Sequence, residues 1–242
     1  MTLTVALSVK GGMVFATDSR GTIGDPRGLT AQNDTIKKMY VVGKQTVLQM
    51  SGASDAGSKI IDEILQTDNP QTLSSTTDVM DRTRKVLKKR YDEWFARMPI
   101  IPIQNSGIPQ RPSLIFTIAG FDDNDNKSIH RIYSLDSSTD FAPFLLNTGM
   151  GLAGVIPYAI YLLHRLFSQE MDIEDALALA AYVITETATQ DGKVGGPLQL
   201  MSLKDGESVV ELTAEKIFEI VNENMERSNK LKELFFSKSD AQ

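Results

Sequence analysis

Four residues early in the chain are of the types that a hydrolase with a hydroxyl nucleophile uses. Thr2 opens a run of alternating apolar residues, Asp18 follows the next apolar run, Lys38 opens a third and Gly52 ends a fourth. Removal of Met1, a common event when residue two is small, would give Thr2 a free α-amine beside its hydroxyl. An unperturbed α-amine has a pKa of about 7.7–8.0, so part of it is uncharged at working pH and able to act as a base. A threonine followed by an acid and a lysine in this order is a candidate hydrolase site.

The composition is that of one ordinary globular domain, and we expect residues 1–242 to form it. The 242 residues are 41% hydrophobic and 23% charged, with a net charge of −6 and a pI of about 5.0, which argues against a nucleic-acid surface. Cysteine is absent, which excludes disulfides, thiol catalysis and thiolate metal sites. The two histidines, His130 and His164, leave little for a metal cluster or a Ser-His-Asp triad, so we expect no metal and no cofactor.

Two further absences bear on location. We find no signal peptide ahead of the first apolar run, and no apolar run reaches the roughly 18 residues of a membrane span. We therefore expect a soluble, cytoplasmic protein without a membrane partner.

The elements that must position the four residues alternate between strands and helices. Strands are predicted from period-two alternation and helices from apolar residues three and four apart. Because strands are grouped and helices come in pairs, regular strand–helix alternation is absent and a parallel sheet is excluded. The order predicts an α+β fold, a four-layer αββα sandwich of two antiparallel sheets flanked by helix pairs. The expected strands are 3–9, 13–17, 38–42, 46–50, 113–120, 129–134, 198–203 and 209–212, and the expected helices include 152–167 and 173–189.

Two motifs suggest other chemistry and are disfavoured. Residues 149–154 read Gly-Met-Gly-Leu-Ala-Gly, the outline of a dinucleotide-binding loop, with Glu170 and Asp172 downstream. The helix that should follow leads into another helix, whereas that motif requires a second parallel strand to carry the acid to a ribose. The acidic stretch 122–126 lacks the sixth-position glycine and twelfth-position glutamate of a calcium loop, so we interpret it as a solvated turn.

Several segments together resemble the β-type proteasome subunits and their bacterial and archaeal relatives among the N-terminal nucleophile hydrolases. No single segment is decisive, but their order and spacing are specific and cover nearly the whole chain. We see no helix ahead of the first strand, which argues against an α-type ring subunit. The segments are Thr2-Leu3-Thr4-Val5-Ala6, Ala16-Thr17-Asp18-Ser19-Arg20, Lys37-Lys38-Met39, Ser51-Gly52-Ala53-Ser54-Asp55, Thr148-Gly149-Met150-Gly151 and Asp191-Gly192.

The resemblance implies a role for each matching residue. Thr2 would attack a peptide carbonyl, with its α-amine moving the proton through a water. Lys38 would place positive charge beside Thr2, Asp18 would hold Lys38, and the Gly52 N–H would stabilise the oxyanion. Lys37 stands beside Lys38, but neighbouring strand residues point to opposite faces, so only one can serve the site.

Further positions receive roles through the same resemblance. Asp191 would support the α-amine, and Thr22 would pair with the substrate backbone. Met50 would line the pocket for the side chain before the scissile bond, and Gly21 would leave space there. A flexible, uncharged lining predicts cleavage after apolar residues.

The resemblance also implies a threonine peptidase that acts on peptides or unfolded proteins within a homo-oligomeric ring, with an ATPase as a candidate partner. Met150 and Val194 stand where the family usually has serines of the proton-shuttling network. A non-catalytic ring subunit is therefore the first alternative. A related amidase or transpeptidase is the second.

Overall fold

The computed structural model describes residues 2–24, 30–66, 75–99, 110–124 and 127–236. Met1, whose removal the site requires, and part of the acidic turn at 122–126 lie outside the described residues. The strands are β1 (Leu3–Val9), β2 (Gly12–Thr17), β3 (Gly21–Gly24), β4 (Thr30–Asn33), β5 (Met39–Val42), β6 (Thr46–Gly52), β7 (Leu114–Asn124), β8 (Lys127–Asp136), β9 (Pro143–Leu145), β10 (Met150–Gly154), β11 (Gln199–Lys204) and β12 (Val210–Glu211). The helices are α1 (Ser54–Gln66), α2 (Thr76–Trp94), α3 (Ile156–Leu166), α4 (Ile173–Gln190) and α5 (Ala214–Phe236), with a short 3-10 turn at Ser137–Thr139.

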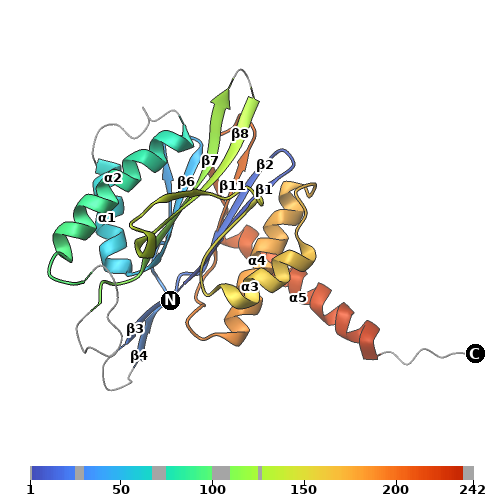
Figure 1. Ribbon diagram of the computed structural model, residues 1–242. Helices are drawn as coiled ribbons and strands as arrows, with labels where there is room; N and C mark the ends of the chain where they lie inside the picture. The colour runs from blue at the N-terminus through green and yellow to red at the C-terminus, as the bar shows by residue number, and fades with distance from the viewer. Residues whose placement is uncertain (1, 25–29, 67–74, 100–109, 125–126, 237–242) are drawn as a thin grey trace, which may run out of the picture.

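Two antiparallel sheets form the centre of the molecule, and helices cover their outer faces (Figure 1). The first sheet has the order β10-β1-β2-β11-β12 and the second the order β5-β6-β7-β8-β9. Helices α1 and α2 cover the second sheet, whereas α3 and α4 cover the first, with α5 leaving the molecule on that side. The predicted αββα sandwich is confirmed, with a third helix on one side.

Three apolar clusters hold these layers together. One joins the first sheet to α3 and α4, a second joins the other sheet to α1 and α2, and a third lies between the two sheets. The alternation of β1 explains this arrangement, because Leu3, Val5 and Leu7 face the helices while Ala6 faces the opposite sheet. Strand β1 is therefore fixed between the helices and the second sheet, and its first residue lies at one end of the two sheets.

Several predicted elements differ in detail. The polar stretch after Asp18 contains the hairpin β3–β4, and β9 was not foreseen because its three residues are exposed and do not alternate. The helix expected from residue 152 begins at Ile156, because residues 150–154 pair with β1 as a strand. The glycine-rich stretch 149–154 is therefore largely a strand, which removes the dinucleotide-loop alternative.

Candidate active site

Thr2 lies at the entrance of β1 and is held by the backbone on both sides. Its carbonyl accepts the N–H of Val155 at 2.8 Å, and the next N–H, that of Leu3, donates to Asp18 Oδ1 at 3.1 Å. Thr17 adds a hydroxyl bond to the Leu3 carbonyl at 3.0 Å. Only 5% of Thr2 is exposed. The strand therefore fixes the position of Thr2 independently of any contact made by its side chain.

Asp18 and Lys38 form a buried ion pair beside Thr2. Lys38 Nζ lies 2.9 Å from Asp18 Oδ1, and the two side chains are 2% and 0% exposed. Lys38 Nζ also donates to the Arg20 carbonyl at 2.7 Å, while Asp18 Oδ2 accepts the N–H groups of Arg20 and Gly195. Both partners therefore have several hydrogen bonds, the condition under which a buried ion pair is tolerated.

Burial dominates the ionisation of Lys38. Desolvation lowers its pKa from 10.5, and the negative charge and hydrogen bond of Asp18 only partly oppose this. Lys37, by contrast, is exposed, lies 3.9 Å from Glu211 and sits over the ring of Tyr40. The structure thus places Lys38, and not its neighbour, beside Asp18 and Thr2, as strand alternation predicts.

Gly52 supplies a backbone N–H that points toward Lys38. The Met50 N–H donates to the Lys38 carbonyl, and the Ala53 N–H donates to Ser113 on the other side of the strand. Because N–H groups alternate sides along a strand, the Gly52 N–H points to the same side as that of Met50, past the first residue of β5. Gly52 has φ of +102°, and a Cβ there would lie 2.1 Å from the Ser113 oxygen, so this position requires glycine.

A small pocket of about 10 Å³ joins these groups. That volume is about the space of one water molecule. It lies between the nucleophile strand, the lysine and the backbone at the start of α1. Its lining residues are Thr2, Lys38, Met50, Ser51, Gly52, Ala53, Ser54 and Leu114.

The glycine that approaches Thr2 is Gly154. A Cβ on Gly154 would lie 1.7 Å from the Thr2 carbonyl oxygen and 3.0 Å from Ser51 Oγ, and its φ is +98°. Met150, expected beside Thr2, pairs instead with Leu7, five residues further along the chain. The residue that follows Gly154 and bonds to Thr2 is Val155, which carries no hydroxyl.

The loop that follows α4 contains Asp191 and Val194, two residues that the resemblance connects with the surroundings of Thr2. Val194 is 0% exposed and packs in the cluster between the first sheet and the helices. Asp191 ends α4, and its carboxylate accepts the Lys193 N–H at 2.9 Å, a turn interaction. Among the described residues, no bond joins the Asp191 side chain to Thr2, so its expected role beside the α-amine stays a prediction.

The expected substrate-binding residues also occupy defined places. Thr22 lies on β3 opposite Gln32, and its hydroxyl oxygen is shielded and lacks a hydrogen-bond partner among the described residues. Gly21 does not leave open space, because a Cβ there would lie 2.1 Å from Ile36 Cδ1. Met50 is 2% exposed and packs against Leu114 and α1 while lining the pocket.

Residues missed by the sequence analysis hold this site together. Arg20 makes two bonds of 2.8 Å to the Asp34 carboxylate and one of 3.2 Å to the Gly192 carbonyl, which ties the loop after α4 to β3 and β4. Gln199 accepts the Lys38 N–H and donates to the Ile36 carbonyl. Arg20 belongs to the segment Ala16-Thr17-Asp18-Ser19-Arg20, but the sequence does not indicate its role. Its partners are more than a dozen residues away along the chain, so no local pattern connects them.

A buried amide also links the nucleophile strand to the strand that ends at Gly52. Gln49 on β6 is 1% exposed, and its Nε2 donates to the carbonyls of Val5 and Ala16, each at 3.1 Å. These two carbonyls belong to β1 and β2 of the opposite sheet. Gln49 therefore constrains how the two sheets sit relative to each other close to the pocket.

The structure also joins a serine, a histidine and an aspartate, contrary to the sequence expectation. Ser8 Oγ lies 2.7 Å from His130 Nδ1, and His130 Nε2 lies 2.8 Å from Asp205 Oδ1. These three hydrogen-bonded residues lie at the opposite end of β1 from Thr2. Among the described residues, no group of three potential metal ligands is close enough to hold an ion.

No family model matches the chain, but solved structures share its fold. Anbu (ancestral beta-subunit) from Yersinia bercovieri is 16% identical, with 99% of each chain covered and a TM-score of 0.73. The protein in the helical assembly of the Anbu complex from Pseudomonas aeruginosa is 20% identical, with 99% of this chain and 98% of that one covered and a TM-score of 0.69. A Gly-1 mutant of Anbu from Hyphomicrobium sp. strain MC1 is 19% identical over all of both chains, with a TM-score of 0.68.

These comparisons correct the expected assignment. The matching structures are Anbu proteins, a proteasome-like but distinct family, so the expectation of a β-type proteasome subunit is wrong. At these identities the likeness defines a proteasome-related fold and nothing finer. None of the described helices is both long and apolar enough to cross a membrane.

Proposed function

We propose that this chain is a threonine-type N-terminal nucleophile hydrolase that cleaves peptide bonds within a homo-oligomeric assembly. The observation that carries the proposal is the buried Lys38–Asp18 pair, which lies with Gly52 around a pocket lined by Thr2. Close backbone packing around Thr2 supports it, because Gly52 and Gly154 both have positive φ and a Cβ on either would collide with neighbouring backbone.

The chemistry follows from these groups once Met1 is removed. The Thr2 Oγ attacks the carbonyl carbon of the substrate, and its proton passes to the α-amine. The Gly52 N–H donates to the resulting oxyanion, and the charge of Lys38 stabilises the developing alkoxide. Collapse breaks the C–N bond, the amine returns its proton to the leaving nitrogen, and an ester to Thr2 remains. Water then attacks this ester with the amine as base and releases the acid.

The pocket limits which substrates fit. Met50, Ala53 and Leu114 give it an uncharged wall, so we propose cleavage after apolar residues. Its volume of about 10 Å³ is too small for a large side chain, so the Met50 thioether must move to admit one. Peptide or unfolded-protein substrates, a cytoplasmic location and an ATPase partner stay predictions.

A non-catalytic assembly subunit is the second candidate, and one observation favours it. Val155 and Val194 bring no hydroxyl to the surroundings of Thr2, so the proton shuttle has fewer partners than the resemblance implies. A related amidase or transpeptidase differs only in the substrate or in the acceptor of the acyl group.

Intact-mass measurement after treatment with a β-lactone tests the proposal. The lactone ring opens on Thr2 Oγ, so the chain without Met1 gains the full mass of the reagent on Thr2. Thr2→Ala should remove the adduct and abolish hydrolysis, an effect of many orders of magnitude, without changing the fold. Thr4→Ala is the matched control, because Thr4 shares the strand face of Thr2 but is 0% exposed. Peptidase activity retained in Thr2→Ala would refute the assignment of the nucleophile.

A further inference from the structure

The outer part of α5 carries large apolar side chains into solvent. The helix has 23 residues, of which only Ile220 and Asn224 are buried. Figure 1 shows that its second half projects away from the sheets and the other helices. Leu231, Phe235 and Phe236 on this half are 52%, 77% and 82% exposed.

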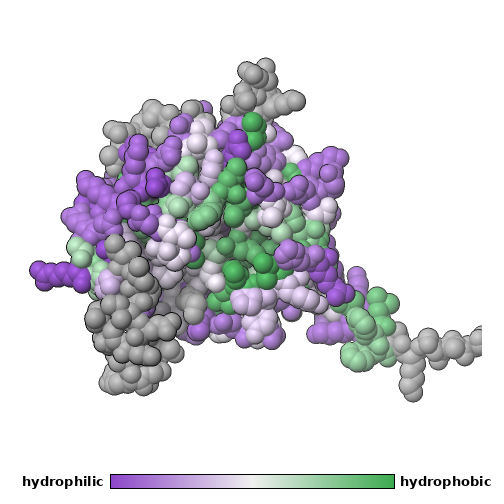
Figure 2. Space-filling view, in the orientation of Figure 1, coloured by the Kyte–Doolittle hydropathy of each residue, from purple (hydrophilic) through white to green (hydrophobic). Residues whose placement is uncertain are grey.

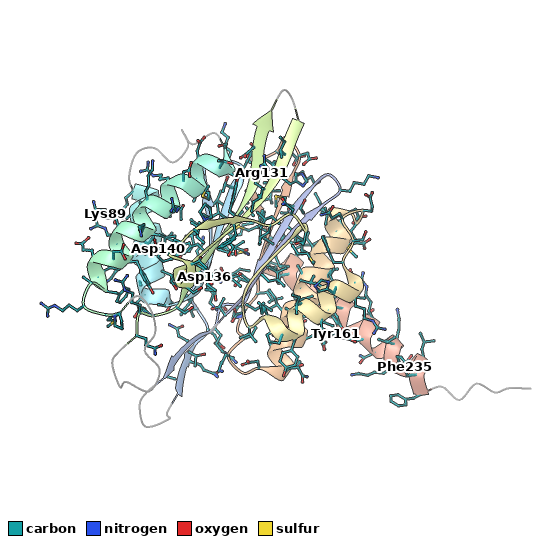
Figure 3. All side chains as sticks on the ribbon, viewed as in Figure 1. Lys89, Arg131, Asp136, Asp140, Tyr161 and Phe235 are labelled. Carbon is teal, nitrogen blue, oxygen red and sulfur yellow. The ribbon has the colours of Figure 1, made fainter. Side chains whose placement is uncertain are left out.

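These side chains form a compact apolar end. Figure 2 shows a hydrophobic area at the outer end of α5, separated from the hydrophobic area at the centre of the molecule. Figure 3 shows Phe235 on this end, directed away from the rest of the molecule. A projecting helix of about three turns is marginal in water without packing, and clustered exposed phenylalanines are typical of an interaction surface.

An apolar groove lies where α5 leaves the molecule. Its cavity volume is about 400 Å³, and it is bounded by the end of α3, the first half of α4 and the middle of α5. The lining of the groove is mostly apolar but includes the polar residues Asp175, Asn224 and Arg227. The lining residues are Leu166, Met171, Asp175, Ala178, Leu179, Tyr182, Asn224, Arg227, Ser228 and Leu231.

The charges of α5 divide sharply between its two parts. Residues 217–226, which lie against the molecule, contain three acidic residues and no basic residue. Residues 227–236, the projecting part, contain three basic residues and one acidic residue. The residues are Glu219, Glu223 and Glu226 in the first part and Arg227, Lys230, Lys232 and Glu233 in the second.

This division favours one orientation between two copies. Two α5 helices side by side and antiparallel bring each basic outer part against the acidic inner part of the other copy. A parallel arrangement would bring like charges together and cost free energy. If the antiparallel helices cross near Lys230, Phe236 of each copy lies opposite the other copy's Asn224, which lines the groove.

We infer that α5 pairs antiparallel with α5 of a second copy, and that Phe235 and Phe236 of each copy occupy the groove of the other. The interface is isologous, so a single two-fold axis produces two equivalent contacts and buries the apolar ends of both copies. This inference deepens the assembly part of the proposed function and does not depend on the chemistry of Thr2.

Sedimentation equilibrium of the full chain over a range of concentrations tests the pairing. Replacing both aromatic residues, F235S with F236S, should weaken the association by at least about tenfold and give a smaller species than the original chain. Phe144→Ser is the control, because Phe144 is a half-exposed aromatic residue on β9 of the second sheet, outside α5. An unchanged mass in the double aromatic variant would overturn the inference.

Charge exchange tests the orientation. An outer variant, K230E with K232E, and an inner variant, E223K with E226K, should each self-associate more weakly. Their equimolar mixture should regain the mass of the original chain, because each outer part then meets an opposite charge. Failure of the mixture to associate would overturn the antiparallel pairing.

Two other results would also decide against it. An original chain that stays monomeric at all concentrations would remove the second copy as the occupant. Flotation of the monomer with vesicles of phosphatidylcholine and phosphatidylglycerol, lost in the aromatic variant, would assign the apolar end to a lipid surface. β-Lactone labelling of Thr2 in the same samples separates these outcomes from failure of the hydrolase proposal.

Discussion

The two ends of the double sheet each carry a polar chain that bridges the sheets. At one end, Asp18 after β2 pairs with Lys38 before β5, beside Thr2. At the other, Ser8 on β1 and Asp205 after β11 both bond to His130 on β8. Strand β1 runs between them, so Thr2 and Ser8 are about 20 Å apart.

The two ends differ in burial and in what surrounds them. The Asp18 and Lys38 side chains are 0% and 2% exposed, whereas those of Asp205 and His130 are 48% and 19% exposed. The ring of His130 stacks on Phe121 with centroids 4.8 Å apart, which fixes it in place. At the Thr2 end, the buried ion pair lies beside a small pocket lined by Thr2, Lys38 and Gly52.

The comparison gives a physical reason to expect different reactivity at the two ends. Electrostatic stabilisation is strong in a water-poor setting and weak beside solvent, where charges are screened. The Thr2 end has a buried charge next to a candidate nucleophile, whereas the His130 end has a partly exposed hydrogen-bond chain. We therefore interpret the first as a catalytic centre and the second as a clasp between the sheets.

Among the changes that compare the two ends, the largest effect is expected from removing the buried charge. Lys38→Met should lower the rate of Thr2 acylation by about 10²–10³-fold, because the developing alkoxide loses its stabilising cation. The variant also leaves Asp18 without its ion partner, at a cost of about 3–5 kcal/mol. Acylation is measured by mass after β-lactone treatment, and stability by urea unfolding.

Two matched variants separate charge from structure. Lys38→Arg keeps a positive charge and should recover part of the acylation rate if the fold is intact. Lys37→Met removes the adjacent, exposed lysine and should leave both rate and stability unchanged. An effect of Lys37→Met as large as that of Lys38→Met would contradict the distinction between buried and exposed charge.

The next effect tests the close approach of two backbones at the catalytic end. Gly154→Ala should destabilise the protein by several kcal/mol and displace Thr2, because the new Cβ would lie 1.7 Å from the Thr2 carbonyl oxygen. Gly206→Ala also has positive φ, of +76°, but faces open space, so it should cost only about 1–2 kcal/mol of backbone strain. Equal losses in the two variants would show that backbone strain, and not the contact, dominates at Gly154.

Sequence reasoning could reach part of this site and not the rest. Alternation indicates that only one of Lys37 and Lys38 can serve the site, and the resemblance selects Lys38. Both residues precede β5, and the structure buries Lys38 and exposes Lys37. The distance of Met150 from Thr2 depends on the register of β10 against β1, which joins residues almost 150 positions apart. The repeated glycines of 149–154 are compatible with several registers, so the sequence does not indicate that Val155 is the residue that bonds to Thr2.

The same limit applies to the fold. The sandwich was predictable because strands and helices are grouped and strongly patterned. The polar stretch 18–34 is compatible with a loop or an irregular hairpin, and the structure forms the hairpin β3–β4. The short strand β9 has no apolar alternation, and a proline in the first turn of α3 is the local signal for where that helix begins. The bonds of Arg20 to Asp34 and of Gln49 to Val5 link separate elements, so no local pattern indicates them.

A smaller effect concerns pH, and it should appear only at the buried end. The pKa of Lys38 is lowered by burial from 10.5. Between this lowered value and 10.5, the unfolded chain binds one more proton than the folded chain, so the free energy of unfolding rises with pH and levels off above 10.5. Activity should fall over the same window, because Lys38 loses its charge while Thr2 stays in place.

Paired measurements isolate this behaviour. Urea unfolding of the original chain and of Lys38→Met, from neutral pH to about pH 11, gives the difference due to Lys38. That difference should favour the original chain increasingly as pH rises. A difference that is flat, or that declines with pH, would mean that the Asp18 charge outweighs burial.

The smallest effect is expected at the clasp. Ser8→Ala should lower the free energy of unfolding by about 0.5–1.5 kcal/mol, the net value of one hydrogen bond. His130→Ala should cost more, because it also removes the bond to Asp205 and the stacking on Phe121. Their effects should not add, because each removes the same bond, and a double-mutant cycle measures the coupling. Hydrolysis at Thr2 should be unchanged, since Gln49 and the Lys38–Asp18 pair hold the opposite end independently.

A fluorophosphonate should leave Ser8 unmodified, because an oriented imidazole without a substrate pocket does not hold the reagent in place. Modification of Ser8 that is lost in His130→Ala would instead make this end a second reactive site and reverse the contrast between the two ends.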